Sequence, residues 1–257
     1  MRILFIGDIV GRPGRGAIKK LLPQIREEHS PDLIIANGEN VSHGKGINMR
    51  HYLEMKKEGI DFFTSGNHIW RQHDIFEIMD KPDTDVIRPA NYPKENPGRG
   101  YQIIEGPLMK KILIINLQGR VFISDDLECP FRAFDKIIEE TAQEKPDYVF
   151  VDFHAEATSE KTCFGLYVDG RAHAVVGTHT HVQTSDERLL PQGTAYITDA
   201  GFVGLTNSAI GIDPEPVIKQ FVSQMPVKHE ITEGSPTTLN GVIIDLESGQ
   251  ATNIKRI

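Results

Sequence analysis

Short apolar runs alternate with amphipathic segments along the first third of the chain, a pattern typical of strands that alternate with helices. The first apolar run covers residues 3–6, and the second covers residues 33–36. Between them, residues 14–29 place their Ile and Leu side chains on one helical face, and Pro31 lies just beyond this predicted helix. By the same criteria we predict a helix, a strand and a further helical segment at residues 49–57, 62–64 and 72–79. The alternation implies a partly parallel sheet.

The second half of the chain is predicted to contain more strands than helices. Residues 82–107 are rich in Pro, Gly and Asn, which favours loop or edge structure over a helix. An amphipathic helix is predicted at residues 131–142, and residues 201–213 are interpreted as a functional loop. Strands are predicted at residues 112–117, 148–153, 174–176, 195–198 and 241–246. Two packed, mixed sheets with helices outside accommodate both halves. Because no repeat or linker interrupts the pattern, we predict a single domain over residues 1–257.

Composition narrows the class of protein. The 257 residues are 39% hydrophobic and 25% charged, which is ordinary for a soluble globule with a core. A formal net charge of −8 disfavours broad contact with long nucleic acid. No stretch approaches the roughly 20 apolar residues of a membrane span, and Asp8 interrupts an opening run too short for a signal peptide. The two cysteines, Cys129 and Cys163, form no metal-ligand pair, so a reducing cytoplasm fits best. The composition leaves open whether the chain forms a homo-oligomer.

Polar clusters follow the predicted strands directly. Asp, Glu, Asn and His are the residue types that hold divalent metals, and ligands in open α/β sheets gather outside the carboxyl ends of strands. The number of candidates exceeds what one tetrahedral zinc needs, and it suits two metals with open positions. The candidate metal ligands are Asp8, Glu39, Asn40, Asn67, His154, His179 and His181.

Each cluster also has a structural interpretation when it is taken alone. Asp8 could be a turn residue or a helix N-cap, and an isolated His154 would more often be a structural histidine. His179 and His181 are two residues apart, so they would face the same side of an extended segment and could reach two adjacent metals. His68 is suited to proton transfer because its unperturbed pKa is about 6.5.

The order of the clusters resembles the calcineurin-like metallophosphoesterase superfamily. That superfamily shows D-x-H, then G-D, then G-N-H-D/E, then a lone His, then G-H-x-H. Here Val10 replaces the first His, Glu39 replaces the bridging Asp, and Ile69 follows Gly66-Asn67-His68 in place of an acid. One extra residue also separates Gly177 from His179. These departures, with the opening Gly7-Asp8-Ile9-Val10-Gly11, are similar to the YmdB-like bacterial metallophosphodiesterases.

The resemblance implies an α/β protein with a four-layer α/β/β/α sandwich, mixed sheets and outer helices. It implies hydrolysis of small cyclic-nucleotide phosphodiesters such as 2′,3′-cyclic AMP, by attack of a metal-bridging hydroxide. It also implies two iron or manganese ions, while the residue types leave zinc open. By the resemblance, Asp8, Glu39, Asn40 and His181 hold one metal, Glu39, Asn67, His154 and His179 hold the other, and His68 is the general acid.

Other functions and other residues stay open at this point. A phosphomonoesterase or nuclease on the same scaffold, or a metal-bound regulatory protein with little turnover, would use the same clusters. The glycine-rich residues 11–16 lack the Lys-Ser/Thr of a P-loop and are interpreted as a strand-to-helix turn, in which Arg12 is a candidate substrate contact. His43 lies in a loop near Glu39, either as a substrate contact or as a solvated side chain.

Overall fold

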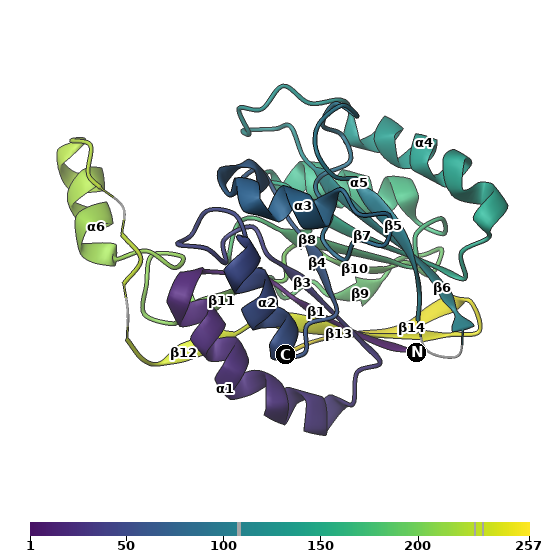
Figure 1. Cartoon of the computed structure of the whole chain (residues 1–257), viewed down its shortest axis with the longest axis horizontal. Coiled ribbons are helices and arrows are strands. Elements are labelled where there is room, and N and C mark those ends of the chain that lie inside the picture. Colours follow the sequence, from purple (N-terminus) through teal and green to yellow (C-terminus); the bar gives the residue numbers. More distant parts are fainter. Residues whose placement is uncertain (107–108, 229, 233) are drawn as a thin grey trace.

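Two stacked β-sheets form the centre of the computed structural model, which describes residues 1–106, 109–228, 230–232 and 234–257 (Figure 1). The first sheet has the strand order β14-β13-β1-β3-β4, and the second has the order β5-β6-β7-β8-β10-β9. The first comprises β1 (Arg2–Ile6), β3 (Leu33–Asn37), β4 (Phe62–Thr64), β13 (Gly241–Glu247) and β14 (Gln250–Arg256). The second comprises β5 (Tyr101–Glu105), β6 (Lys111–Gln118), β7 (Tyr148–His154), β8 (Ala174–Thr178), β9 (Arg188–Leu189) and β10 (Ala195–Ile197).

Parallel strands occupy the middle of both sheets. In the first sheet β3 pairs in parallel with β1 and β4, and in the second β7 pairs in parallel with β6 and β8. The antiparallel partners β13 and β5 lie beside these parallel strands. A small third sheet, β12 (Thr237–Leu239), β11 (Phe202–Leu205) and β2 (Asp8–Ile9), continues from the end of β1. The carboxyl ends of the parallel strands in each sheet therefore share one edge.

Helices cover the outer faces of both sheets (Figure 1). On the first sheet, α1 (Gly11–His29) contributes Ile18 and α2 (Met49–Lys57) contributes Met55 to one apolar cluster. On the second sheet, α4 (Pro130–Thr141) and α5 (Thr158–Val168) contribute the side chains of another cluster, which includes Phe134 and Phe164. The predicted four-layer α/β/β/α sandwich is confirmed.

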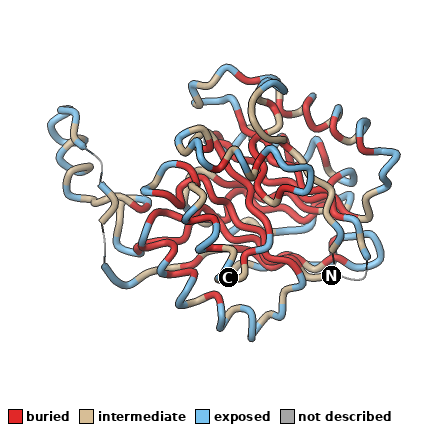
Figure 2. The backbone as a smooth tube through the Cα atoms, viewed as in Figure 1, coloured by how far each residue is buried: buried red, intermediate tan, exposed pale blue. Residues whose placement is uncertain are grey.

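A third apolar cluster lies between the two sheets. Strand alternation sends Ile3 and Phe5 towards the second sheet, while Leu4 and Ile6 pack under the helices. The rings of Phe5 and Phe150 are 5.4 Å apart across this interface. Because the central strands are buried on both faces, they are continuous apolar runs in the sequence. Figure 2 shows the buried residues concentrated in these strands.

Residues 11–16 correct one prediction, because they form the first turns of α1 and not a strand-to-helix turn. Pro13 is tolerated there, since the first backbone N–H groups of a helix have no intrahelical partner. Gly14 packs so closely on β11 that a Cβ atom would meet the carbonyl oxygen of Val203 and the side chain of Ile9. Gly14 thus serves helix–sheet packing.

Other boundaries differ from the predictions. In the predicted helical segment at residues 72–79, a 3₁₀ turn (His73–Ile75) leads into the short helix α3 (Phe76–Met79). Extended backbone at Gln72 separates this 3₁₀ turn from the preceding one, Ile69–Arg71. The predicted loop at residues 201–213 contains β11 instead, which pairs with β2 and β12. The edge structure predicted for residues 82–107 is present as β5.

The sequence patterns missed β14, α5 and α6 (Pro214–Ser223). The buried face of α5 includes Lys161 and Gly165, which hide its amphipathic pattern. For α6 the sequence did carry a signal, because Asp213 is a typical N-cap residue and is followed by Pro214 at the first helical position. In the structure, Asp213 accepts a hydrogen bond from the Glu215 backbone N–H. This helix projects from the body of the molecule (Figure 1). Within the described ranges, no helix is long and apolar enough to cross a membrane.

Candidate metal centre

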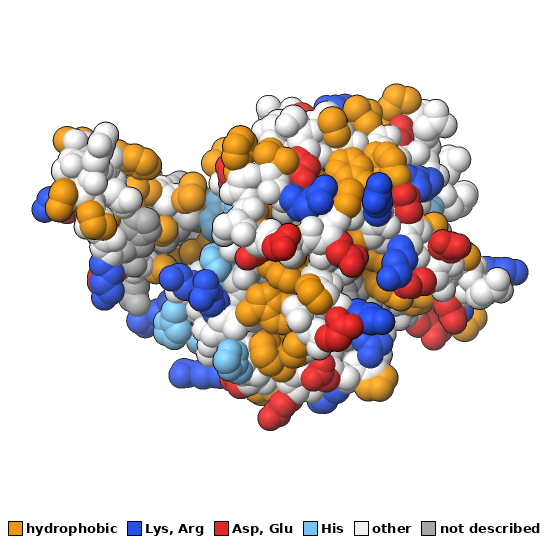
Figure 3. Space-filling model, turned by 90° about the horizontal axis from the view of Figure 1, so that it is seen from above, with side chains coloured by type: hydrophobic (Ala, Val, Ile, Leu, Met, Phe, Trp, Pro, Cys, Tyr) orange, Lys and Arg blue, Asp and Glu red, His pale blue; other side chains and the backbone are white. Residues whose placement is uncertain are grey.

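The predicted ligands all lie at the carboxyl ends of parallel strands. Asp8 follows β1, Glu39 and Asn40 lie in the turn after β3, and Asn67 follows β4. From the second sheet, His154 ends β7, and His179 and His181 follow β8. Seen from above, histidine side chains gather in the recess between the lobe that carries α6 and the body (Figure 3). The strand ends of both sheets therefore meet at one site.

Two groups of candidate ligand atoms share Glu39. In one group, ligand atoms of Glu39, His154 and His179 all lie within 4.8 Å of one another, and in the other, so do those of Glu39, Asp8 and His181. The His154 Nε2 atom is 3.1 Å from Glu39 Oε2 and 3.1 Å from His179 Nδ1. In the second group, His181 Nε2 is 4.0 Å from Asp8 Oδ1. A carboxylate common to both groups is the arrangement expected of a bridging ligand.

Unpaired oxygen atoms support a cation at this site. Asp8 Oδ1 and Asn67 Oδ1 are buried, and neither has a hydrogen-bond partner in the part of the chain that the structure describes. A buried polar atom left in this state costs about 1–3 kcal/mol. A cation would satisfy both oxygens, and the mixture of carboxylate, amide and imidazole donors suits manganese, iron or zinc.

The pKa shifts of the site residues in the protein without a metal show which proton a cation would replace. Burial raises the pKa of Asp8. Burial also acts to raise the pKa of Glu39, but His154 and His68 hold it well below its usual range. Burial acts to lower the pKa of His154, but Glu39 and Asp8 raise it to about 9. Burial and His154 lower the pKa of His179 to about 3. Without a metal, the raised pKa of His154 favours its protonated form beside Glu39, and a metal would have to displace that proton.

Hydrogen bonds at their outer nitrogens orient the rings of His154 and His181. The His181 Nδ1 atom is 2.9 Å from the carbonyl oxygen of Ile210, which can only accept, so Nδ1 carries the proton and Nε2 faces the site. The His154 Nδ1 atom is 2.9 Å from Thr178 Oγ1, and that hydroxyl donates to Asp152 at 2.7 Å. Partners of this kind fix the tautomer of metal-ligating histidines.

Asp152 was missed by the sequence analysis. It is fully buried within β7 and accepts hydrogen bonds from Thr178, Thr64 and Asn37. Burial raises its pKa to about 7. A charged residue inside a continuous apolar strand was the available signal, because such a residue must find polar partners in the core. Asp152 thereby anchors the hydroxyl that orients His154.

The backbone around His179 and His181 corrects another prediction. Their φ angles are 98° and 62°, so the segment is a turn with left-handed residues and not an extended strand. Left-handed conformations of non-glycine residues cost of order 1–3 kcal/mol each unless the surroundings hold them. The carboxylate of Asp199 accepts hydrogen bonds from Thr180 N and Oγ1 at 3.2 and 2.8 Å, and Lys161 Nζ lies 2.6 Å from it. This buried anchor holds the turn.

Local geometry excludes one structural interpretation of Asp8 and explains a glycine beside the site. The N-cap of α1 is Val10, so Asp8 does not cap that helix. At Gly66, a Cβ atom would collide with the Glu39 carboxylate and the His154 ring. Glycine is therefore required where β4 ends, because one candidate ligand from each sheet, Glu39 and His154, approaches the chain closely there.

His68 lies beside the candidate ligands. Its Nδ1 atom is 3.1 Å from Asn40 Nδ2 and 3.3 Å from Glu39 Oε1, and 27% of its side chain is exposed. The amide nitrogen of Asn40 can only donate and the Glu39 carboxylate can only accept, so the two contacts favour opposite tautomers of His68. The role of general acid stays a prediction.

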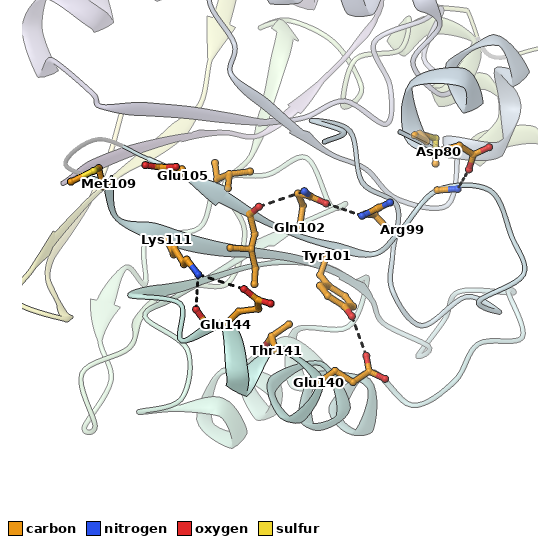
Figure 4. Close-up of a pocket in the computed structure, with 14 residues that line it drawn as sticks. Asp80, Arg99, Tyr101, Gln102, Glu105, Met109, Lys111, Glu140, Thr141 and Glu144 are labelled. Carbon is orange, nitrogen blue, oxygen red and sulfur yellow. Dashed lines mark hydrogen bonds and ion pairs between the residues drawn. The ribbon is translucent and has the colours of Figure 1, made fainter. Parts of the chain in front are cut away.

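Several cavities lie outside the candidate metal groups. One of about 860 Å³ runs along β5, and its polar groups bond to one another, as Tyr101 does to Glu140 and Lys111 to Glu144 (Figure 4). A smaller cavity of about 380 Å³ is lined by Arg12 and His43, among others. This second cavity adjoins the turn that carries Asn40, because Asn40 Nδ2 donates to the carbonyl oxygen of Gly44.

The sandwich and the cluster at its strand ends define the class of proteins with the metallophosphoesterase fold. Within this class, the YmdB-like protein family matches residues 4–257, and the chain belongs to that family. A relative from Bacillus subtilis (strain 168), named 2′,3′-cyclic-nucleotide 2′-phosphodiesterase, is 48% identical over 100% of this chain and 96% of its own.

Two solved structures share the whole fold. A hypothetical protein from Thermus thermophilus superposes with a TM-score of 0.92 at 40% identity, over 100% of this chain and 98% of its own. A protein from Mycoplasma pneumoniae, described as a novel phosphatase, superposes with a TM-score of 0.92 at 35% identity, over 100% of this chain and 92% of its own. The family assignment and the fold therefore agree.

Proposed function

We propose that this protein is a metal-dependent phosphodiesterase that hydrolyses small cyclic-nucleotide phosphodiesters such as 2′,3′-cyclic AMP. The observation that carries the proposal is the pair of ligand groups that share Glu39, together with the buried, unpaired oxygens of Asp8, a member of one group, and of Asn67, the residue after Gly66. The name and 48% identity of the Bacillus subtilis relative support the same activity.

Two cations, iron or manganese with zinc as the alternative, would be held by the residues of the two groups. Asp8, Glu39, Asn40 and His181 would hold one, and Glu39, Asn67, His154 and His179 would hold the other. Such a pair of cations supplies a hydroxide nucleophile from water and stabilises charge on the phosphoryl oxygens.

The protein's own residues set the charge of the site. Asp8 and Glu39 contribute two negative charges, whereas the amides and the imidazoles are neutral when they act as ligands. Two divalent cations therefore leave a net positive site, which suits a singly charged diester. His68 would donate a proton to the leaving 2′ oxygen as the cyclic ester opens.

Rival activities on the same scaffold make different predictions. A phosphomonoesterase would favour a 5′-nucleotide, a nuclease would favour an oligonucleotide, and a regulatory protein would show little turnover with any of them. The name of the Mycoplasma pneumoniae protein keeps the first rival in view. We place a small phosphodiester ahead of long nucleic acid because the net charge is −8.

We also propose a single domain over residues 1–257 and a cytoplasmic location.

The test is reconstitution with Mn²⁺ or with Fe²⁺ under anaerobic conditions, followed by measurement of kcat/KM for three substrates. These are 2′,3′-cyclic AMP, a 5′-nucleotide and a short oligonucleotide, with the Glu39→Gln variant as the inactive control. We expect the cyclic diester to give the highest kcat/KM. A preference for the monoester, or activity that Glu39→Gln leaves intact, would overturn the proposal.

A further inference from the structure

Glu156 contacts the outer nitrogen of a candidate ligand. It lies between β7 and α5, two residues after His154, and its Oε2 atom is 3.1 Å from His179 Nε2. The other ring nitrogen of His179, Nδ1, is 3.1 Å from His154 Nε2 and so faces the candidate metal centre. His179 therefore presents to the site the nitrogen opposite to the one that His154 and His181 present.

The chemistry of imidazole makes this contact consequential. A neutral imidazole has one N–H group and one lone pair, and a nitrogen that binds a cation must be the one without the proton. A carboxylate accepts hydrogen bonds and cannot donate them, so the contact with Glu156 favours the tautomer of His179 that carries its proton on Nε2. The lone pair is then on Nδ1. The other tautomer would direct an N–H group at the cation.

We propose that Glu156 is a positioning residue that fixes the tautomer and the ring orientation of His179, so that Nδ1 can ligate a cation. The inference deepens the proposed metal centre and rests on it. Glu156 acts through His179 and has no assigned contact with substrate.

The surrounding structure defines where this carboxylate lies. The flanking Ala155 and Ala157 are buried, at 0% and 8% exposure, so the backbone on both sides of Glu156 is held in the core. The same stretch of chain supplies Lys161, which binds the Asp199 carboxylate that anchors the turn after β8. Residues 154–161 therefore support the turn at His179 at two points, through Glu156 at His179 and through Lys161 at Asp199. The Glu156 side chain itself is 45% exposed, so competition with water weakens its contact with His179.

Three variants separate positioning from general structure. Glu156→Ala removes the acceptor, and Glu156→Gln keeps an amide oxygen that can accept from Nε2–H without the charge. Glu160→Gln is the matched control, because Glu160 belongs to the same stretch but accepts from the backbone N–H groups of Arg120 and Val121. Partners of metal-ligating histidines typically contribute about 10- to 100-fold in affinity, and half-exposure places Glu156 near the lower end.

The measurements are Zn²⁺ affinity, by chelator competition on the full chain, and the histidine tautomers, by ¹⁵N NMR of the zinc-loaded protein. We expect one of the two ions to bind about 10-fold more weakly in Glu156→Ala, with most of that loss restored in Glu156→Gln. Wild-type His179 should show a protonated Nε2 and a ligating Nδ1.

Unchanged affinity in Glu156→Ala would refute the inference, as would an equal loss in Glu160→Gln or ligation of wild-type His179 through Nε2. A wild-type protein that binds no Zn²⁺, Mn²⁺ or Fe²⁺ would instead refute the proposed metal centre. The two failures are therefore distinguishable.

Discussion

Replacement of Lys161 by methionine tests how the buried ion pair holds the site. The side chains of Lys161 and Asp199 are 1% and 0% exposed, and Lys161 Nζ is 2.6 Å from Asp199 Oδ2. Methionine keeps most of the length of lysine but leaves the carboxylate buried without its cation. Removal of one partner from a buried pair typically costs about 3–5 kcal/mol, against a total stability of about 5–15 kcal/mol for a native protein.

That free energy converts into a large thermal shift. One kcal/mol changes Tm by roughly 2–4 °C in a chain near this size, so Lys161→Met should lower Tm by about 6–20 °C. The backbone N–H groups of Thr180 and Gly201 and the Thr180 hydroxyl also donate to Asp199. Because they partly compensate its charge, we expect the fall in Tm to lie towards the lower end of this range. The assay is calorimetry of the metal-free protein, with Zn²⁺ affinity measured beside it, because the same carboxylate anchors the His179 turn.

An exposed pair provides the control. Lys111 and Glu144 are 3.4 Å apart with side chains 47% and 62% exposed, so Lys111→Met should change Tm little. The double variant Lys161→Met/Asp199→Asn removes the uncompensated charge and should recover part of the lost stability. A shift below about 2 °C in Lys161→Met, or a double variant that is less stable than Lys161→Met, would refute this reasoning.

Three further predictions concern the metal centre. Glu39→Gln should lower the content of both metals per chain, because one carboxylate belongs to both groups; full metal content would contradict this. His68→Ala should reduce kcat for 2′,3′-cyclic AMP by about 10²–10⁴-fold with both metals retained, and by less for a diester with a nitrophenolate leaving group. An equal reduction for both substrates would exclude general acid catalysis. Mn²⁺ affinity should rise with pH up to about 9, because metal must displace the proton that the raised pKa of His154 retains below that value; an affinity independent of pH would contradict this.

The candidate ligands could be predicted from the sequence because the relevant information is local. A polar residue such as Asp8 or His154 at the end of an apolar run is visible in a few consecutive residues, and the carboxyl ends of parallel strands share an edge. The core strands were recognisable for the same reason. The structure confirms the layered fold and brings together the candidates Asp8, Glu39, His154, His179 and His181, while their roles as ligands remain predictions.

The partners of the supporting residues could not be predicted because they are remote in sequence. Lys161 meets Asp199 38 residues away, and the amide of Asn37 meets Asp152 115 residues away. A buried lysine also breaks the apolar pattern by which α5 would be recognised. The extended backbone predicted at His179 was wrong for a related reason. Its φ angle depends on the anchored turn and not on its neighbours in the chain.

The two sheets contribute different chemistry to the site. The candidate oxygen ligands follow strands of the first sheet, and the candidate nitrogen ligands, His154, His179 and His181, follow strands of the second. In the protein alone, His154 Nε2 lies 3.1 Å from Glu39 Oε2, and this contact joins the two sets. Cations would take its place and bind oxygens from one sheet and nitrogens from the other. Metal binding would therefore link the strand ends of both sheets. Substitutions of side chains that pack between the two sheets should then alter metal affinity, although they replace no ligand.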